Sequence, residues 1–164
     1  MKYLATALLI LAPMAPLTAL AQDAEVAPPA FVEKAATSNM FEIQSSQMAQ
    51  DKATDPALKE FAAQMITDHE KAGADLKAAA GDIPVPTELA PKEAEMMGLL
   101  EKAEGAEFDD LYKTMQVRAH TEAVALFQGF AENGDDADLK AFATATLPTL
   151  EEHKAHIEQI TTGQ

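Results

Sequence analysis

The clearest hydrophobic pattern along the chain lies between residues 55 and 76, where apolar residues recur at spacings of three and four. This period predicts one amphipathic helix, which Asp55 can cap and Pro56 can begin. One polar side chain, His69, falls on the same face as Phe61. Burying an unpaired polar group costs roughly 1–3 kcal/mol, so we expect His69 to have a partner in the core.

Similar patterns predict four more helices. The first helix ends just before the second, with Ala53-Thr54 as a short turn between them. Asp136 begins a run that matches the run from Asp55 as D-x-x-L-K-x-F-A. Short turns make neighbouring helices antiparallel, whereas the proline-rich stretch 83–86 begins a long connection. We therefore predict an all-α, ferritin-like four-helix bundle, made of two antiparallel helical hairpins with a long crossover that carries a short helix. Besides the segment from Asp55 to Leu76, the helices are expected at about 29–52, 91–103, 106–132 and 137–160.

The N-terminus has the pattern of a signal peptide. Lys2 is followed by an apolar run, and Ala19-Leu20-Ala21 offers small residues for cleavage. The expected organisation is a signal peptide at 1–21, a flexible leader at 22–30 and a helical domain at 31–162. No later stretch is apolar enough for a transmembrane anchor. We expect a soluble exported protein, periplasmic if the source is Gram-negative.

Composition excludes several kinds of site. The chain carries 12 basic and 27 acidic residues, a net charge of −15, and no cysteine. Nucleic acid is excluded as a partner because its phosphates require a basic surface. Disulfides, thiolate metal sites and cysteine nucleophiles are excluded as well. The acidic run at 101–110 is expected to be a solvated face, and both a monomer and a homodimer are compatible with the sequence, with no protein partner indicated.

Four polar residues on core-facing positions form the candidate site: Glu42, His69, His120 and His153. Glu42 and His69 lie at similar depths from the turn between their helices, whereas His120 and His153 differ by about 6 Å at 1.5 Å per residue. Three imidazoles and a carboxylate suit one transition-metal ion, either zinc, copper or iron. Glu122 could serve as an additional ligand. Neutral imidazole is the binding form, so metal affinity is expected to fall below about pH 6.5.

The alternative is a structural or partner-binding bundle without metal. In this interpretation Glu42 pairs with His69, and His120 or Glu122 pairs with His153, as buried hydrogen-bonded groups. His156 falls off the apolar stripe and is expected to be solvated. The methionines could hold Cu(I) through their thioethers, but methionine commonly fills gaps between helices.

The sequence resembles a bacterial exported family of domains of unknown function that is grouped with the ferritin-like superfamily and often described as outer-membrane proteins. The resemblance covers roughly residues 30 to 160 and implies a helical bundle in the cell envelope with no established activity. It rests on Phe31-Val32 with Ala35-Ala36, Glu42-Ile43, LKEFAAQMITDHEKA at 58–72, Phe108-Asp109 with Tyr112, His120, and Leu147-Pro148 followed by His153.

One difference from that superfamily bears on activity. Its di-iron enzymes carry Glu-x-x-His on two helices, but Ile66 precedes His69 by three residues and Leu150 precedes His153 by three. Bridging carboxylates for two irons are missing, so we do not predict an enzyme. The sequence favours binding of a single ion, in metal handling or envelope stress, over a bundle that binds none.

Overall fold

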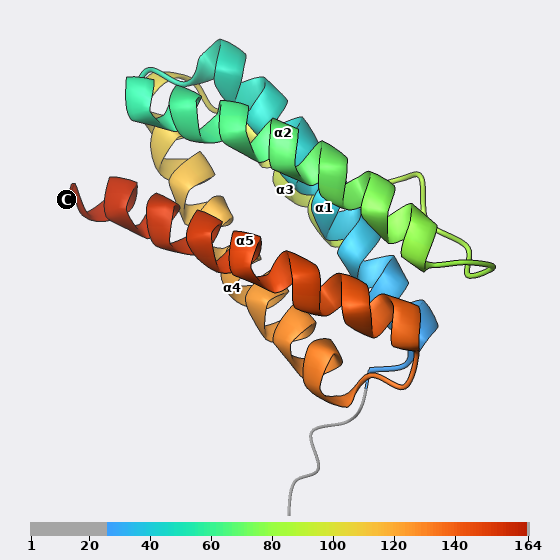
Figure 1. Cartoon of the computed structure of the whole chain (residues 1–164). Helices are drawn as coiled ribbons and strands as arrows, with labels where there is room; N and C mark the ends of the chain where they lie inside the picture. The colour runs from blue at the N-terminus through green and yellow to red at the C-terminus, as the bar shows by residue number, and fades with distance from the viewer. Residues whose placement is uncertain (1–25, 164) are drawn as a thin grey trace, which may run out of the picture.

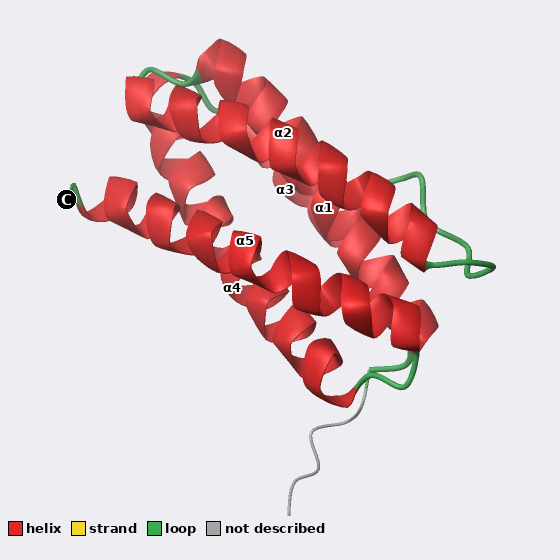
Figure 2. Cartoon of the chain, viewed as in Figure 1, coloured by secondary structure: helices red, strands yellow, loops and turns green. Residues whose placement is uncertain are grey.

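The computed structural model describes residues 26–163, and all regular secondary structure in that part of the chain is helical (Figures 1 and 2). Helix α1 packs along α2, α4 packs along α5, and the two hairpins join through α2 with α5 and α1 with α4. The structure thus confirms the predicted all-α bundle of two hairpins with a crossover helix. The helices are α1 (Pro28–Lys52), α2 (Pro56–Ala79), α3 (Pro91–Lys102), α4 (Gly105–Asn133) and α5 (Ala137–Thr162).

Local sequence explains where the helices begin. Asp55 accepts a hydrogen bond from the Ala57 amide at 2.9 Å and caps α2, as predicted, and Asp136 caps α5 in the same way. Proline stands at the start of α1, α2 and α3. Helix α1 begins at Pro28, so the last residues of the expected leader 22–30 are helical. The predicted signal peptide at 1–21 lies outside the described residues.

The crossover helix α3 packs against α1 and α4, and Lys52 fixes its C-terminal end. The Lys52 ammonium donates to the carbonyl oxygens of Glu101 and Ala103 at 2.7 and 2.9 Å and pairs with Glu104 at 2.9 Å. A cation is favourable there because the last carbonyls of a helix lack intrahelical partners. This contact ties the end of α1 to the end of α3.

The acidic run at 101–110 is not wholly solvated, because Asp109 is only 6% exposed. Its carboxylate accepts hydrogen bonds from the amides of Thr54 and Asp55, at 2.9 and 3.1 Å, and from the Thr54 hydroxyl. These donors lie in the turn between α1 and α2, so Asp109 fastens the first hairpin to α4. The sequence interpretation was wrong for this residue.

Asp109→Asn is expected to lower the free energy of unfolding by about 1–3 kcal/mol, because an amide cannot accept from all three donors and loses the charge assistance. Urea unfolding followed by circular dichroism measures the difference. Asp110→Asn is the matched control, since the Asp110 side chain is 78% exposed beside Lys113, and it should change stability by less than about 0.5 kcal/mol. Equal stability of the two variants would contradict this role for Asp109.

The core consists of two apolar clusters with a polar layer between them. Phe61, Met65 and Tyr112 belong to the first cluster, and Phe31 and Phe127 to the second. Each of the four long helices contributes to both clusters, and on α2, α4 and α5 the polar layer lies where the helix passes from one cluster to the other. The buried polar residues of this layer are Glu42, Ser45, Ser46, His69, Gln116, His120 and His153. Among the described residues, no helix is long and apolar enough to cross a membrane.

Candidate metal centre

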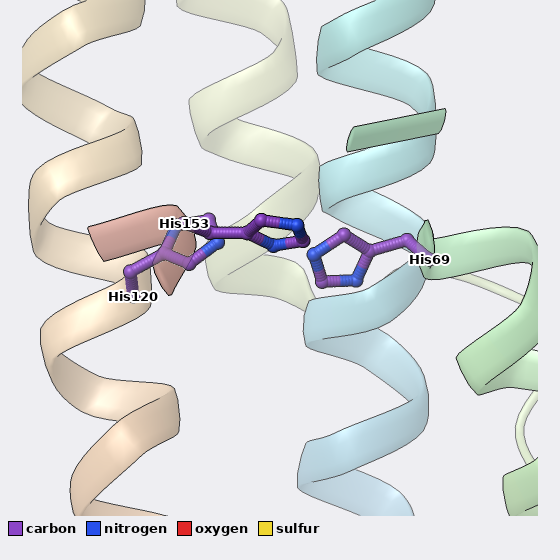
Figure 3. Close-up of side chains that lie close together, drawn as sticks. All are labelled: His69, His120 and His153. Atoms are coloured by element: carbon purple, nitrogen blue, oxygen red, sulfur yellow. The ribbon is translucent and has the colours of Figure 1, made fainter. Parts of the chain in front are cut away.

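Three histidines from three helices meet in the polar layer. His69 comes from α2, His120 from α4 and His153 from α5, and each is at most 5% exposed. Their ring centroids lie 5.4 to 5.9 Å apart, and one ring nitrogen from each lies within 4.8 Å of the other two (Figure 3). The structure therefore brings together the three histidines that the sequence placed on core positions.

One nitrogen of each ring faces an oxygen atom that can only accept a hydrogen bond. That nitrogen must carry the proton and donate, which fixes the tautomer of the neutral ring. The opposite nitrogen then presents its lone pair. The contacts are His69 Nδ1 to Asn39 Oδ1 at 2.9 Å, His120 Nδ1 to the Gln116 carbonyl at 2.9 Å, and His153 Nε2 to Asp68 Oδ2 at 2.8 Å.

The other three ring nitrogens are buried and have no hydrogen-bond partner among the described residues: His69 Nε2, His120 Nε2 and His153 Nδ1. Each buried acceptor without a partner lowers the free energy of unfolding by about 1–3 kcal/mol. Metal-binding histidines characteristically donate their second nitrogen to a carboxylate or a carbonyl, as these rings do. The arrangement therefore has the form of a metal site, with three free lone pairs and three oriented rings.

The distances between the rings suit a single ion. Two nitrogens that each lie about 2.0–2.1 Å from one tetrahedral ion are about 3.3 Å apart. The nitrogens of the cluster lie within 4.8 Å of one another. Each nitrogen–nitrogen distance would therefore need to shorten by about 1.5 Å at most to hold one ion. Small changes in the side-chain torsions can supply such a movement.

Glu42 from α1 borders the cluster. Its Oε1 lies 3.9 Å from His120 Nδ1, and its Oε2 has no partner within the described part of the chain. Burial raises the pKa of Glu42 to about 8, although the Gln116 amide lowers it in part. The carboxyl group is therefore mostly protonated at neutral pH. The prediction that Glu42 pairs with His69 is wrong, since Glu42 lies beside His120 and His69 bonds to Asn39.

The structure does not bring Glu122 to the histidines. Its side chain is 48% exposed on α4 and forms ion pairs with Arg118, at 2.8 Å, and with Lys92 of α3. The Lys92 ammonium, more than any other neighbour, lowers the pKa of Glu122. Glu122 follows His120 by two residues, a spacing that puts two side chains on different sides of a helix. His156 is not among the converging histidines, and it packs on Phe61, with ring centroids 5.4 Å apart.

The residues that orient the rings were not found from the sequence. Asn39 precedes Glu42 by one helical turn, and it packs over Gly73, where a Cβ atom would come within 2.9 Å of the Asn39 amide nitrogen. Asp68 is adjacent to His69 but serves His153 on a different helix. Periodicity identifies which residues point inward, but it does not show which neighbours on other helices they meet.

Burial changes the acid response of the histidines. It lowers the pKa of His120 to about 4, and burial together with the two neighbouring rings holds the pKa of His69 well below 6.5. Both rings therefore stay neutral at pH values where a free imidazole is charged. The expectation that metal affinity falls through pH 6.5 does not hold for these two ligands, which keep their lone pairs to lower pH.

The metal-free protein is expected to lose stability as the pH falls from about 6.5 to 4.5. In this window the unfolded chain takes up protons at His69 and His120 while the folded protein does not, so the free energy of unfolding decreases. Glu42 acts in the opposite direction, because its folded-state pKa is raised, but two imidazoles outweigh one carboxyl. Urea unfolding at several pH values in the presence of a chelator measures this slope.

A His69→Gln/His120→Gln variant is the control for the acid response. The variant retains Glu42 but lacks the two histidines. Its free energy of unfolding should therefore rise as the pH falls from 6.5 to 4.5, whereas that of the wild type should fall. Parallel profiles for the variant and the wild type would show that the two histidines do not cause the slope.

Comparison with known proteins gives a family and a fold. A family model described as "Domain of unknown function (DUF4142)" matches residues 13–160. The fold is similar to CopM in its Cu(II)-bound form, with a TM-score of 0.69 and 18% identity over 84% of this chain and 97% of that chain. CopM in the Cu(I)-bound form gives 0.69, and in the Ag-bound form 0.66, each at 18% identity over 84% of this chain and 96% of that chain. No curated protein matches this chain in sequence.

Proposed function

This chain belongs to the DUF4142 family, a domain of unknown function, and we propose that it binds one transition-metal ion in the centre of the bundle. His69, His120 and His153 are the proposed ligands, with Glu42 beside them. The observation that carries the proposal is the convergence of three buried rings that each offer one nitrogen within 4.8 Å of the other two. Each ring is oriented by one hydrogen bond and keeps one buried nitrogen without a partner among the described residues.

Charge balance supports the same site. Three neutral imidazoles leave both charges of a divalent ion uncompensated, and an unpaired charge in a core is strongly unfavourable. Glu42, close to His120, can supply one negative charge when the ion displaces its proton. The Asp68 carboxylate can supply the other through its hydrogen bond to His153. Glu42 and Asp68 thus provide the compensation that a divalent ion requires.

Copper is the ion that we propose first. Imidazole nitrogens suit zinc, copper, iron and nickel, so the ligand set alone does not select one of them. CopM, which shares the fold, has been solved with Cu(II), Cu(I) and Ag. The net charge of −15 favours the approach of cations from a distance. We propose a role in metal handling outside the cytoplasm, in keeping with the signal-like pattern at 1–21.

A bundle that binds no metal is the second candidate, and two contacts favour it. His153 is bonded to Asp68 at 2.8 Å, and Glu42 lies 3.9 Å from His120. These contacts involve His153 Nε2 and His120 Nδ1, so they leave His153 Nδ1 and His120 Nε2 without a partner among the described residues. A purely structural layer would have no reason to keep three unpaired acceptors together, because apolar residues would pack there at lower cost. The metal site explains more of the observed geometry.

Elemental analysis tests the proposal. The natural protein, purified from its source without an affinity tag or a chelator, is expected to contain close to one copper per chain, whereas a His69→Ala/His153→Ala variant should contain none. His156→Ala is the matched control and should keep its metal. If the wild type is free of metal and takes up neither Cu²⁺, Zn²⁺ nor Fe²⁺ afterwards, the proposal is wrong.

A further inference from the structure

A cavity of about 630 Å³ opens beside the histidine cluster. All four long helices and the start of α3 contribute to its wall, which includes His69 and Asn39 but neither His120 nor His153. It extends from the polar layer into the second apolar cluster, where Phe127 and Phe142 line it. The proposed metal site accounts for one side chain in this wall and does not account for the space itself.

The wall of the cavity is mostly apolar. Its volume falls within the range of about 300–1,000 Å³ that is typical of small-molecule sites, which combine an apolar lining with a few polar groups. Neutral polar side chains from α1 and α5 interrupt the apolar surface and can form one or two hydrogen bonds. The apolar lining includes Phe41, Leu76, Phe127, Phe142 and Leu150, and the neutral polar lining includes Ser38, Asn39 and Thr146.

The charged groups at the exposed side of the cavity are balanced, in contrast to the strongly acidic chain as a whole. Three basic and three acidic residues line it, and two of the basic residues are already paired with Glu122. An anion would meet the repulsion of a net charge of −15. Apart from Glu122, the acidic residues are Glu33 and Glu93, and the basic residues are Lys34, Lys92 and Arg118.

We propose that this cavity binds a small uncharged molecule with an apolar body and one or two hydrogen-bonding groups. Burial of apolar surface supplies the affinity. The lining selects against charged molecules because burying a charge against the apolar interior of the cavity is strongly unfavourable. The site requires no metal, so it is independent of the metal-binding proposal, although His69 belongs to the wall of one and to the centre of the other.

Fluorescence titration of metal-free protein with N-phenyl-1-naphthylamine tests the site. This neutral probe is expected to bind once per chain with a blue-shifted emission. The same ring system bearing a sulfonate, 8-anilinonaphthalene-1-sulfonate, should bind at least tenfold more weakly. Absence of binding by the neutral probe would refute the site, and equal binding of the two probes would refute the selection against charge.

Two substitutions on α5 locate the bound probe. Thr146→Phe fills part of the cavity and should weaken binding of the neutral probe at least tenfold, whereas Thr144→Phe adds the same ring on the exposed side of the helix and should not. Ala123→Phe fills the cavity from α4 and replaces Thr146→Phe if that variant does not fold, as judged by circular dichroism. Undiminished binding in folded cavity-filling variants would place the probe elsewhere and overturn the proposal.

Discussion

Cu²⁺ in excess, at a free concentration about 1,000 times its dissociation constant, is expected to raise the melting temperature of the domain by about 10 °C. A ligand that binds only the folded state stabilises it by about 4 kcal/mol when its free concentration is 1,000 times the dissociation constant. For a domain of this size each kcal/mol corresponds to about 2–4 °C. Differential scanning calorimetry with and without a chelator measures the shift. The same experiment with Zn²⁺ shows which of the two ions raises the melting temperature more.

The shift should depend on the cluster and on no other histidine. His120→Ala removes one of three proposed ligands, so it should weaken copper binding at least a hundredfold and abolish most of the shift. His156→Ala should retain the full shift, because His156 is not one of the three histidines whose ring nitrogens converge. A copper shift that is the same in both variants would show that the ion binds to surface groups.

The helical periodicity was enough to predict the bundle, since an apolar stripe must be buried and short turns force neighbouring helices to be antiparallel. The cap at Asp55 was predicted from a local rule, and Asp136, which begins the matching run, caps α5. The role of Asp109 was not predictable, because its partners belong to a turn that lies far away in the sequence. Nothing in the acidic run around it distinguishes it from Asp110, which is exposed.

The candidate site was predictable only in part. The histidines could be found because a polar residue on an apolar stripe is unusual, and the structure places three of them together. Helix rise suggested that His120 and His153 differ in depth, yet their ring centroids lie 5.5 Å apart. Glu122 was misplaced because two neighbouring stripes on α4 look alike in sequence, and only packing shows that His120 lies on the buried one. Residues that orient the rings depend on contacts between helices, which periodicity does not contain.

Replacing Glu42 with glutamine is expected to stabilise the metal-free protein at alkaline pH. The folded-state pKa of Glu42 is about 8, against an ordinary value of 4.5, because the ionised carboxylate is buried without a partner cation. Between these values the folded protein holds a proton that the unfolded chain has released, so the free energy of unfolding falls as the pH rises. The loss is complete near pH 8 and amounts to about 4 kcal/mol. Glutamine is neutral at every pH, so the Glu42→Gln variant does not lose this stability as the pH rises.

The measurement is the difference in urea stability between Glu42→Gln and the wild type, in the presence of a chelator. It should grow in favour of the variant by about 4 kcal/mol from pH 4.5 to pH 8 and level off above that. Glu122→Gln is the control, because that carboxylate is exposed and paired with Lys92 and Arg118, and its difference should not grow with pH. A constant difference for Glu42→Gln would mean that the carboxyl group is already ionised in the folded protein at neutral pH. Copper would then meet a preformed negative charge beside His120 and would not have to displace a proton.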